Sequence, residues 1–300
     1  MPVLGGLESG AGLDVVIWLQ AHGNGFFDAL GIALHAAGSE VFYLAMLALL
    51  MWAVDRRLGV RLLFALILAS VVTETLKNLF QTPRPHLAYP EQVTALVAQG
   101  GFGMPSGHVL IGLVVWGYLA WRLRRRAVTL LVGGYVLLLG WSRMYVGVHY
   151  PQDVLVGLIV GGLLLWGYVR FADGVAAWWW RASLGGQIAV IVACSLLVVL
   201  LTVGSADGLA LGGLLLGIGP GLLWAERSAR FSARGSLWRR GLRLGGGLVI
   251  LLAVFFGGRV LFAGLEPPQL WRMLRYAIVG ATAIALWPWL CLRLGLAMPD

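Results

Sequence analysis

Three segments of the chain carry residue types that could together bind and cleave a phosphate ester. They have the sequences KNLFQTPRP (77–85), PSGH (105–108) and SRMYVGVHYPQD (142–153). Three cations with no matching local anions suit a phosphate ester, because its oxygens accept charge-assisted hydrogen bonds, which arginine can donate in pairs. The groups that could do this chemistry are Lys77, Arg84, Arg143, His108, His149 and Asp153.

The third segment pairs an imidazole with a carboxylate. Pro151 favours the first turn of a helix, which places Asp153 near the helix start and His149 just before it. Such a carboxylate can fix the tautomer of the His149 ring, leave its other nitrogen free to attack and stabilise the imidazolium. His108 has no carboxylate within four residues, so it is the better candidate for donating a proton to a leaving oxygen.

The second segment is expected to begin a helix. Ser106 is a favourable N-cap residue, and a helix start offers free N–H groups and a positive dipole end to an anion. Gly107 lets the backbone approach such an anion closely. The sequence therefore predicts that Ser106 and Gly107 contribute to an anion cradle.

The composition determines which elements must position these groups. Of the 300 residues, 60% are hydrophobic and 12% are charged, against about 25% charged in an average soluble domain. This excludes a soluble enzyme, a disordered chain and a disulfide-stapled secreted domain. Long apolar runs predict spanning helices, so we expect an all-α, polytopic membrane helical bundle of about nine transmembrane helices. The runs lie at about 41–54, 59–80, 107–121, 127–145, 151–170, 187–204, 208–225, 246–264 and 273–292.

The basic residues predict how this bundle is oriented. If the 55–61 loop lies inside and the chain alternates, 16 of the 22 basic residues fall inside, as the positive-inside rule requires. All three motif segments then meet at the outer face. The basic residues lie mostly between the apolar runs, which is typical of membrane topology rather than of nucleic-acid binding. We therefore expect no nucleic-acid partner. The outer cations are Lys77, Arg84, Arg143, Arg259, Arg272 and Arg275, of which the last three either anchor the chain at the interface or bind a diphosphate or lipid headgroup.

We expect three regions along the chain. Residues 1–40 would form N-terminal interfacial helices, although a membrane span within 13–37 is the alternative. Residues 41–172 would form the helical core that holds the three motifs. Residues 176–300 would add about four further transmembrane helices.

The motifs K-x6-R-P, P-S-G-H and S-R-x5-H-x3-D, in this order, resemble the three signatures of the type 2 phosphatidic acid phosphatase family. Bacterial lipid phosphatases, sphingosine phosphate phosphatases, glucose-6-phosphatase and the vanadium haloperoxidases share them. The match runs from Lys77 to Asp153 and fills every signature position, whereas 176–300 falls outside it.

The resemblance implies a role for each motif residue. His149 would be the nucleophile that forms a phosphohistidine, Asp153 would orient it, and His108 would be the general acid. No cofactor and no metal is implied. The residues implied to hold the phosphoryl oxygens are Lys77, Arg84, Arg143, Ser106 and Gly107.

Several neighbours of the motifs are expected to border the pocket. Glu74 lies three residues before Lys77 on one helical face, so it either neutralises that cation or helps to position substrate. His22 and His35 are interpreted as packed polar residues. The expected border residues are Glu74, Pro85, His86, Tyr145 and Tyr150.

Together these features predict a metal-independent, vanadate-sensitive lipid phosphatase in the cell (inner) membrane, with its site facing the periplasm or exterior. Its substrate would be a lipid phosphate or diphosphate, such as undecaprenyl diphosphate or a phospholipid phosphate. A lipid phosphotransferase that uses the same phosphohistidine and a non-catalytic transporter or scaffold are the alternatives. Membrane lipids are the expected surroundings, and the oligomeric state is left open.

Overall fold

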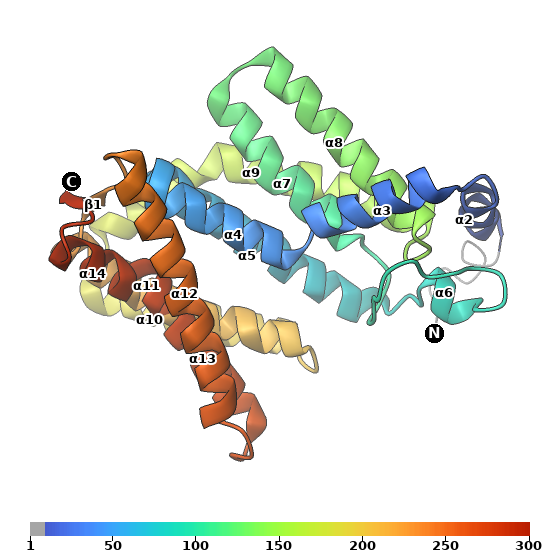
Figure 1. Ribbon diagram of the computed structural model, residues 1–300. Coiled ribbons are helices and arrows are strands. Elements are labelled where there is room, and N and C mark those ends of the chain that lie inside the picture. Colours follow the sequence, from blue (N-terminus) through green and yellow to red (C-terminus); the bar gives the residue numbers. More distant parts are fainter. Residues whose placement is uncertain (1–9) are drawn as a thin grey trace. The chain divides into compact units, whose positions relative to one another are not determined.

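The computed structural model describes residues 10–300, apart from the side chain of Ala206, and is almost entirely helical (Figure 1). The described chain forms two compact units. The first unit contains the residues up to Tyr43 and Ala65–Asp173, and the second contains Leu44–Phe64 and Gly174–Asp300. All three motif segments therefore lie in the first unit.

The predicted apolar runs all fall within helices or a few residues of their ends. Two boundaries differ most. Helix α9 continues to Arg181, well past the end of its apolar run, and α12 begins at Leu237, several residues before its apolar run, because a basic stretch forms its first turns. From the N-terminal side, the elements are α2 (Ala11–Ala21), α3 (Gly25–Ala37), α4 (Glu40–Leu49), the π-helical η1 (Leu50–Val54), α5 (Arg56–Phe80), α6 (Pro85–Ala88), α7 (Gly107–Leu123), α8 (Arg126–Tyr145) and α9 (Pro151–Arg181). They continue with α10 (Leu184–Leu201), α11 (Ala206–Ser228), β1 (Phe231–Ser232), α12 (Leu237–Leu261), α13 (Pro268–Ala281), the π-helical η2 (Thr282–Leu286), α14 (Trp287–Arg293) and β2 (Met298–Pro299).

The all-α membrane architecture is confirmed. Within the described residues, seven helical segments are long and apolar enough to cross a membrane. An eighth span results if α3 and the continuous α4–η1 segment, which are bent by 55° at their junction, count as one. Helix α7 is apolar too but has only 17 residues. The predicted number of about nine is thus an approximation, since it depends on the bent pair and on this short helix.

Helix α7 joins its neighbours in the first unit. Ala65 and Ala69 of α5 pack against Leu110 and Val114 of α7 in one buried cluster, and partly buried residues of α9 pack onto it. A second cluster joins Val109, Val136 and Val154 of α7, α8 and α9. Because the second motif begins α7 and the third joins α8 to α9, this packing brings the two motifs together.

Two glycines let α9 approach α7 closely. A Cβ atom on Gly157 would lie 3.0 Å from the carbonyl oxygen of Ser106, and one on Gly161 would lie 3.2 Å from that of Leu110. Small residues spaced four apart allow such contacts between membrane helices. This close approach places the start of α7 beside the start of α9.

The N-terminal helices belong to the same unit. Helix α3 begins after Asn24, whose side-chain oxygen accepts hydrogen bonds from the N–H groups of Phe26 and Phe27 at 3.0 and 3.2 Å. Both α2 and α3 pack on α8. Gln20 also donates to the carbonyl oxygens of Thr94 at 2.7 Å and Tyr145 at 2.9 Å, so it links the 81–106 loop to the end of α8.

In the second unit, α11 packs against α10 and α13. Cβ atoms on Gly213 and Gly217 would collide with carbonyl oxygens of α13, so this glycine pair also serves close helix packing. Strands β1 and β2 pair in antiparallel register, with Phe231 opposite Pro299. The predicted boundaries at 40/41 and 172/176 stay predictions.

Candidate active site

His149 lies between a carboxylate and a guanidinium group. Its Nδ1 is 3.2 Å from Oδ2 of Asp153, and its Nε2 is 3.0 Å from Nη1 of Arg84. A carboxylate oxygen accepts and a guanidinium only donates. The ring is therefore neutral, with its proton on Nδ1 and its lone pair on Nε2.

Burial preserves this neutral state. His149 is only 2% exposed, and burial lowers its pKa well below the usual value of 6.5. The positive charges of Arg84, Arg143 and Lys77, with a smaller effect from His108, lower the pKa further. A neutral imidazole backed by a carboxylate can attack phosphorus through Nε2.

The third motif holds Asp153 in place. The backbone N–H of Tyr150 donates to Oδ2 of Asp153 at 3.0 Å, and Asp153 is 1% exposed. Pro151 begins α9 as predicted, which puts the carboxylate in the first turn of the helix. Asp153 thus faces back toward His149 because the helix starts between them.

Arg84 is held by three backbone carbonyl oxygens. Its Nε donates to the oxygens of Gly100 and Gly101 at 2.9 and 3.1 Å, and Nη1 also donates to Val148 at 3.0 Å. The side chain is 1% exposed. Arg84 therefore joins the first motif to the later part of the 81–106 loop and to the third motif.

Ser106 connects the second motif to the third. Its backbone N–H donates to the carbonyl oxygen of Asp153 at 2.9 Å. Ser106 takes the predicted N-cap position of α7, but its hydroxyl makes no capping bond. That hydroxyl is buried with no hydrogen-bond partner among the described residues. Gly107 packs so closely on α5 that a Cβ atom would lie 3.1 Å from Cγ2 of Thr73.

His108 contacts His35, for which the sequence predicted no role in the site. Its ring stacks on His35 of α3, with centroids 5.1 Å apart and planes inclined by 15°. Its Nε2 lies 3.2 Å from the carbonyl oxygen of His35, which can only accept, so Nε2 carries a proton. His35 was expected to be a packed polar residue, whereas it contacts two motif residues.

Arg143 is the second motif residue that His35 contacts. Its Nη1 donates to Nδ1 of His35, and Nη2 donates to Oε1 of Gln99 at 3.2 Å. Arg143 is 0% exposed, and its Nε is buried without a hydrogen-bond partner in the part of the chain that the structure describes. Its carbonyl oxygen accepts from the N–H of His149 at 3.2 Å, so this hydrogen bond joins the last turn of α8 to His149.

Lys77 is paired with Glu74. The Nζ and Oε1 atoms are 2.8 Å apart across one turn of α5, and both side chains are mostly buried. This ion pair is the first of the two roles considered for Glu74, in which it neutralises Lys77. It leaves a part of the Lys77 ammonium available, since that group has three donors.

The structure places the remaining expected border residues around the third motif. The ring Nδ1 of His86 lies 3.2 Å from the carbonyl oxygen of Gly147, and Pro85 is buried at the start of α6. The Tyr145 hydroxyl donates to Asp28 at 2.6 Å. Tyr150 packs in a core cluster with residues of α2. Their role as pocket borders stays a prediction.

Across residues 10–300, no group of three or more His, Cys, Asp or Glu side chains gathers in a way that could hold a metal ion. The polar groups around His149 are instead mostly donors. Such a set of guanidinium, ammonium, hydroxyl and backbone N–H groups can bind a tetrahedral oxyanion.

Two family models match this chain. The model of the PAP2 superfamily matches residues 58–177, which include all three motifs. The model described as the transmembrane extension of PAP2 superfamily phosphatases matches residues 209–299. The second match gives an assignment to the region that the motif resemblance left outside.

Individual relatives are named as lipid phosphatases. Lipid phosphate phosphatase delta of Arabidopsis thaliana is 27% identical over 51% of this chain and 40% of its own length. A probable sphingosine-1-phosphate phosphatase of Dictyostelium discoideum is 30% identical over 49% of this chain and 39% of its own. The matches thus span about two fifths of these relatives.

Bacterial proteins match as well. Phosphatidylglycerophosphatase B of Bacillus subtilis is 31% identical over 31% of this chain and 48% of its own length. A crystal structure of a transmembrane PAP2-type phosphatidylglycerolphosphate phosphatase from Bacillus subtilis aligns with a TM-score of 0.48 and 22% identity, covering 55% of this chain and 86% of that one. The motifs, the helical membrane fold and the two family matches agree, and this multi-pass membrane protein belongs to the PAP2 superfamily.

Proposed function

We propose that this protein is a lipid phosphatase that hydrolyses a lipid phosphate or diphosphate through a phosphohistidine on His149. The observation that carries the proposal is the alignment of Asp153, the neutral His149 ring and Arg84. This alignment supports attack by Nε2, because Asp153 accepts from Nδ1 and can stabilise the cation that forms there.

Arg84 indicates where the phosphoryl group binds. In the structure Nη1 of Arg84 donates to Nε2 of His149. A phosphoryl oxygen that takes over this donor brings phosphorus next to the nitrogen lone pair. Arg143, Lys77, the Ser106 hydroxyl and the Gly107 N–H supply further donors. The Ser106 hydroxyl and Nε of Arg143 lack hydrogen-bond partners within residues 10–300, so an oxyanion would satisfy both.

The reaction then proceeds in two steps. Nε2 of His149 forms a bond to phosphorus as the bond to the leaving oxygen breaks, and His108 gives its proton to that oxygen. A water molecule then attacks phosphorus and gives a proton to His108, and the bond to Nε2 breaks to release inorganic phosphate. The second step thus returns to His108 the proton that the first step used.

His35 serves as a positioning residue in this scheme. Its ring supports His108 by stacking, and its Nδ1 holds Arg143. Both the proton donor and a phosphoryl-binding cation are therefore oriented by one side chain of α3. It acts through these two residues and need not touch the substrate.

The names of the relatives and the membrane fold favour a lipid substrate. They include proteins named for sphingosine-1-phosphate, phosphatidylglycerophosphate and undecaprenyl diphosphate. In the predicted topology the site faces the outside of the cell membrane. Lipids of the outer leaflet would then reach it at headgroup depth.

The test is a phosphate-release panel on purified full-length protein in EDTA, with and without vanadate. It includes undecaprenyl diphosphate, phosphatidate, phosphatidylglycerophosphate, a sphingoid phosphate and glucose 6-phosphate. We expect EDTA-resistant, vanadate-blocked release from at least one lipid, and a labelled phosphate trapped on His149 by rapid acid-free quenching. Label on another residue would refute the mechanism, and faster transfer to an acceptor lipid than to water would indicate the phosphotransferase.

A further inference from the structure

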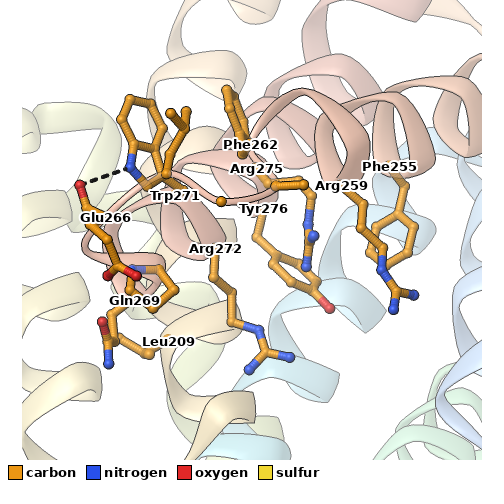
Figure 2. A pocket seen from close by; sticks show the side chains of 14 residues that line it. Leu209, Phe255, Arg259, Phe262, Glu266, Gln269, Trp271, Arg272, Arg275 and Tyr276 are labelled. Atoms are coloured by element: carbon orange, nitrogen blue, oxygen red, sulfur yellow. Dashed lines mark hydrogen bonds between the residues drawn. The ribbon is translucent and has the colours of Figure 1, made fainter.

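A second basic site lies in the second unit, at the turn between α12 and α13. This turn borders a cavity of about 550 Å³ (Figure 2). Its wall combines cations with aromatic rings. The cations are Arg259, Arg272 and Arg275, and the rings include those of Phe255, Trp271 and Tyr276.

The charges of this cavity are unbalanced. Three arginines line it, but among the described residues that line it Glu266 is the only one with a carboxylate. None of the three arginines forms an ion pair within residues 10–300. In Figure 2 their side chains extend to one side of the α12–α13 turn, with Tyr276 between Arg259 and Arg272. Unneutralised arginines near a membrane are costly unless they bind an anion.

Arg275 is held in place by aromatic rings. Its Cζ lies 5.0 Å from the ring centre of Phe255 and 5.4 Å from that of Tyr276, which are cation–π distances. Its Nε is buried and has no hydrogen-bond partner in the described chain. One guanidinium of the cavity is therefore oriented before any ligand arrives and keeps an unused donor.

The surroundings indicate that the ligand belongs to a lipid. Phe256, Val260 and Leu261, at the end of α12 beside the cavity, expose their apolar side chains. The Trp271 indole donates to the carbonyl oxygen of Glu266 at 3.3 Å, as suits a tryptophan at a membrane interface. A molecule with acyl chains can lie on the apolar surface and place its phosphate among the arginines.

We propose that the cavity at the α12–α13 turn binds the phosphate of an anionic lipid headgroup. The residues that line the cavity belong to the second unit, whereas the proposed catalytic residues all belong to the first. Arginine favours phosphate because its N–H groups can donate to two oxygens at once. The predicted topology places these arginines on the outer face, so the ligand is a lipid of the outer leaflet.

The test uses full-length protein in nanodiscs and phosphatidylglycerol, a phosphodiester lipid. Quenching of Trp271 by brominated-acyl phosphatidylglycerol is compared with quenching by brominated-acyl phosphatidylcholine. The Trp271→Phe protein supplies the signal of the other tryptophans, which is subtracted. We expect phosphatidylglycerol to quench at about ten- to thirtyfold lower mole fraction, given the usual attraction per arginine.

The matched variants distinguish a site from general attraction. Arg259→Gln/Arg272→Gln should abolish the preference, while Arg122→Gln/Arg125→Gln, which removes two exposed charges at the α7–α8 turn, should keep it. Equal loss in both would overturn the proposal. Displacement by millimolar inorganic phosphate would show that the ligand is free phosphate and would also overturn it.

Failure of this proposal is separable from failure of the catalytic one. Arg259→Gln/Arg272→Gln should hydrolyse a short-chain, water-soluble phosphate at the wild-type rate. A variant that folds, keeps this rate and still prefers phosphatidylglycerol would refute the lipid site alone.

Discussion

Arg143 in the first unit and Arg243 in the second are both 0% exposed, but their partners differ. Arg243 donates to the backbone carbonyls of Ser232, Ala233 and Arg234. Arg143 instead binds the side chains of His35 and Gln99, and its backbone carbonyl accepts from the N–H of His149.

Burial of an arginine therefore does not by itself reveal a functional site. An unpartnered Nε occurs at both positions within the described residues, so this feature does not separate them either. The two arginines differ in the groups that their guanidinium groups contact. Arg243 hydrogen-bonds the backbone of one local loop beside β1. Arg143 instead joins side chains from distant parts of the chain around a neutral imidazole.

Loss of His149 should reduce activity more than any other single change in the first unit. His149→Ala removes the proposed nucleophile, and hydrolysis should fall by about 10⁴-fold or more, to background. The measurement is phosphate release per folded protein. His22→Ala is the matched control: it loses one hydrogen bond to the carbonyl oxygen of Trp18 and should keep most of the activity. Retained activity in His149→Ala would remove the proposed mechanism.

The next effect contrasts the two buried arginines directly. Arg143→Lys should lower kcat/KM by about 10²- to 10³-fold, because an ammonium cannot hold both its partners and a phosphoryl oxygen in the same geometry. Arg243→Lys should leave kcat/KM within about twofold but lower stability by about 2 kcal/mol, since lysine cannot reach three carbonyls. The measurements are thermal unfolding and steady-state kinetics of both variants. Equal losses of kcat/KM would contradict the different roles of the two arginines.

A smaller effect tests the positioning role of His35. His35→Ala should lower kcat by about 10- to 100-fold with less change in KM, because His108 and Arg143 lose their shared support. His35→Asn should recover part of the rate, since its side-chain oxygen can still accept from Arg143. His22→Ala is the control, because His22 is exposed and bonds only within its own turn. Similar losses for the two histidines would indicate a general effect on folding.

His35 also marks the limit of what the sequence could reveal. The motifs identify Arg84, His108 and His149 because their types and spacing are local. His35 precedes Arg143 by 108 residues and follows no spacing rule, and Gln99 lies in a loop between two motifs. Their contacts arise from the packing of α3 and the 81–106 loop around α8, which a single sequence does not encode in any local pattern.

The fold was predictable where long apolar runs dominate. Helix existence follows from hydropathy, whereas the start of α12 lies in a basic stretch before the apolar run, where Arg243 is buried by hydrogen bonds to the backbone of 232–234. The α3–α4 bend of 55° was not predictable either, because the interruption at Gly38 and Ser39 is consistent with either a loop or a kinked span. Tertiary contacts decide such cases.

The smallest expected effect concerns pH. Burial and the neighbouring cations lower the pKa of His149 well below 6.5, so the free enzyme keeps a neutral nucleophile from pH 8 down to pH 6.5. Across this interval kcat/KM should change by less than about threefold through His149 and should fall only at lower pH, where the ring gains a proton. The measurement is the pH profile of kcat/KM, with titration of the substrate phosphate, near pH 6, determined separately and subtracted. A corrected acid limb centred above pH 6.5 would mean that the essential base is not held neutral by burial, and that Arg84 does not lie against Nε2 in solution.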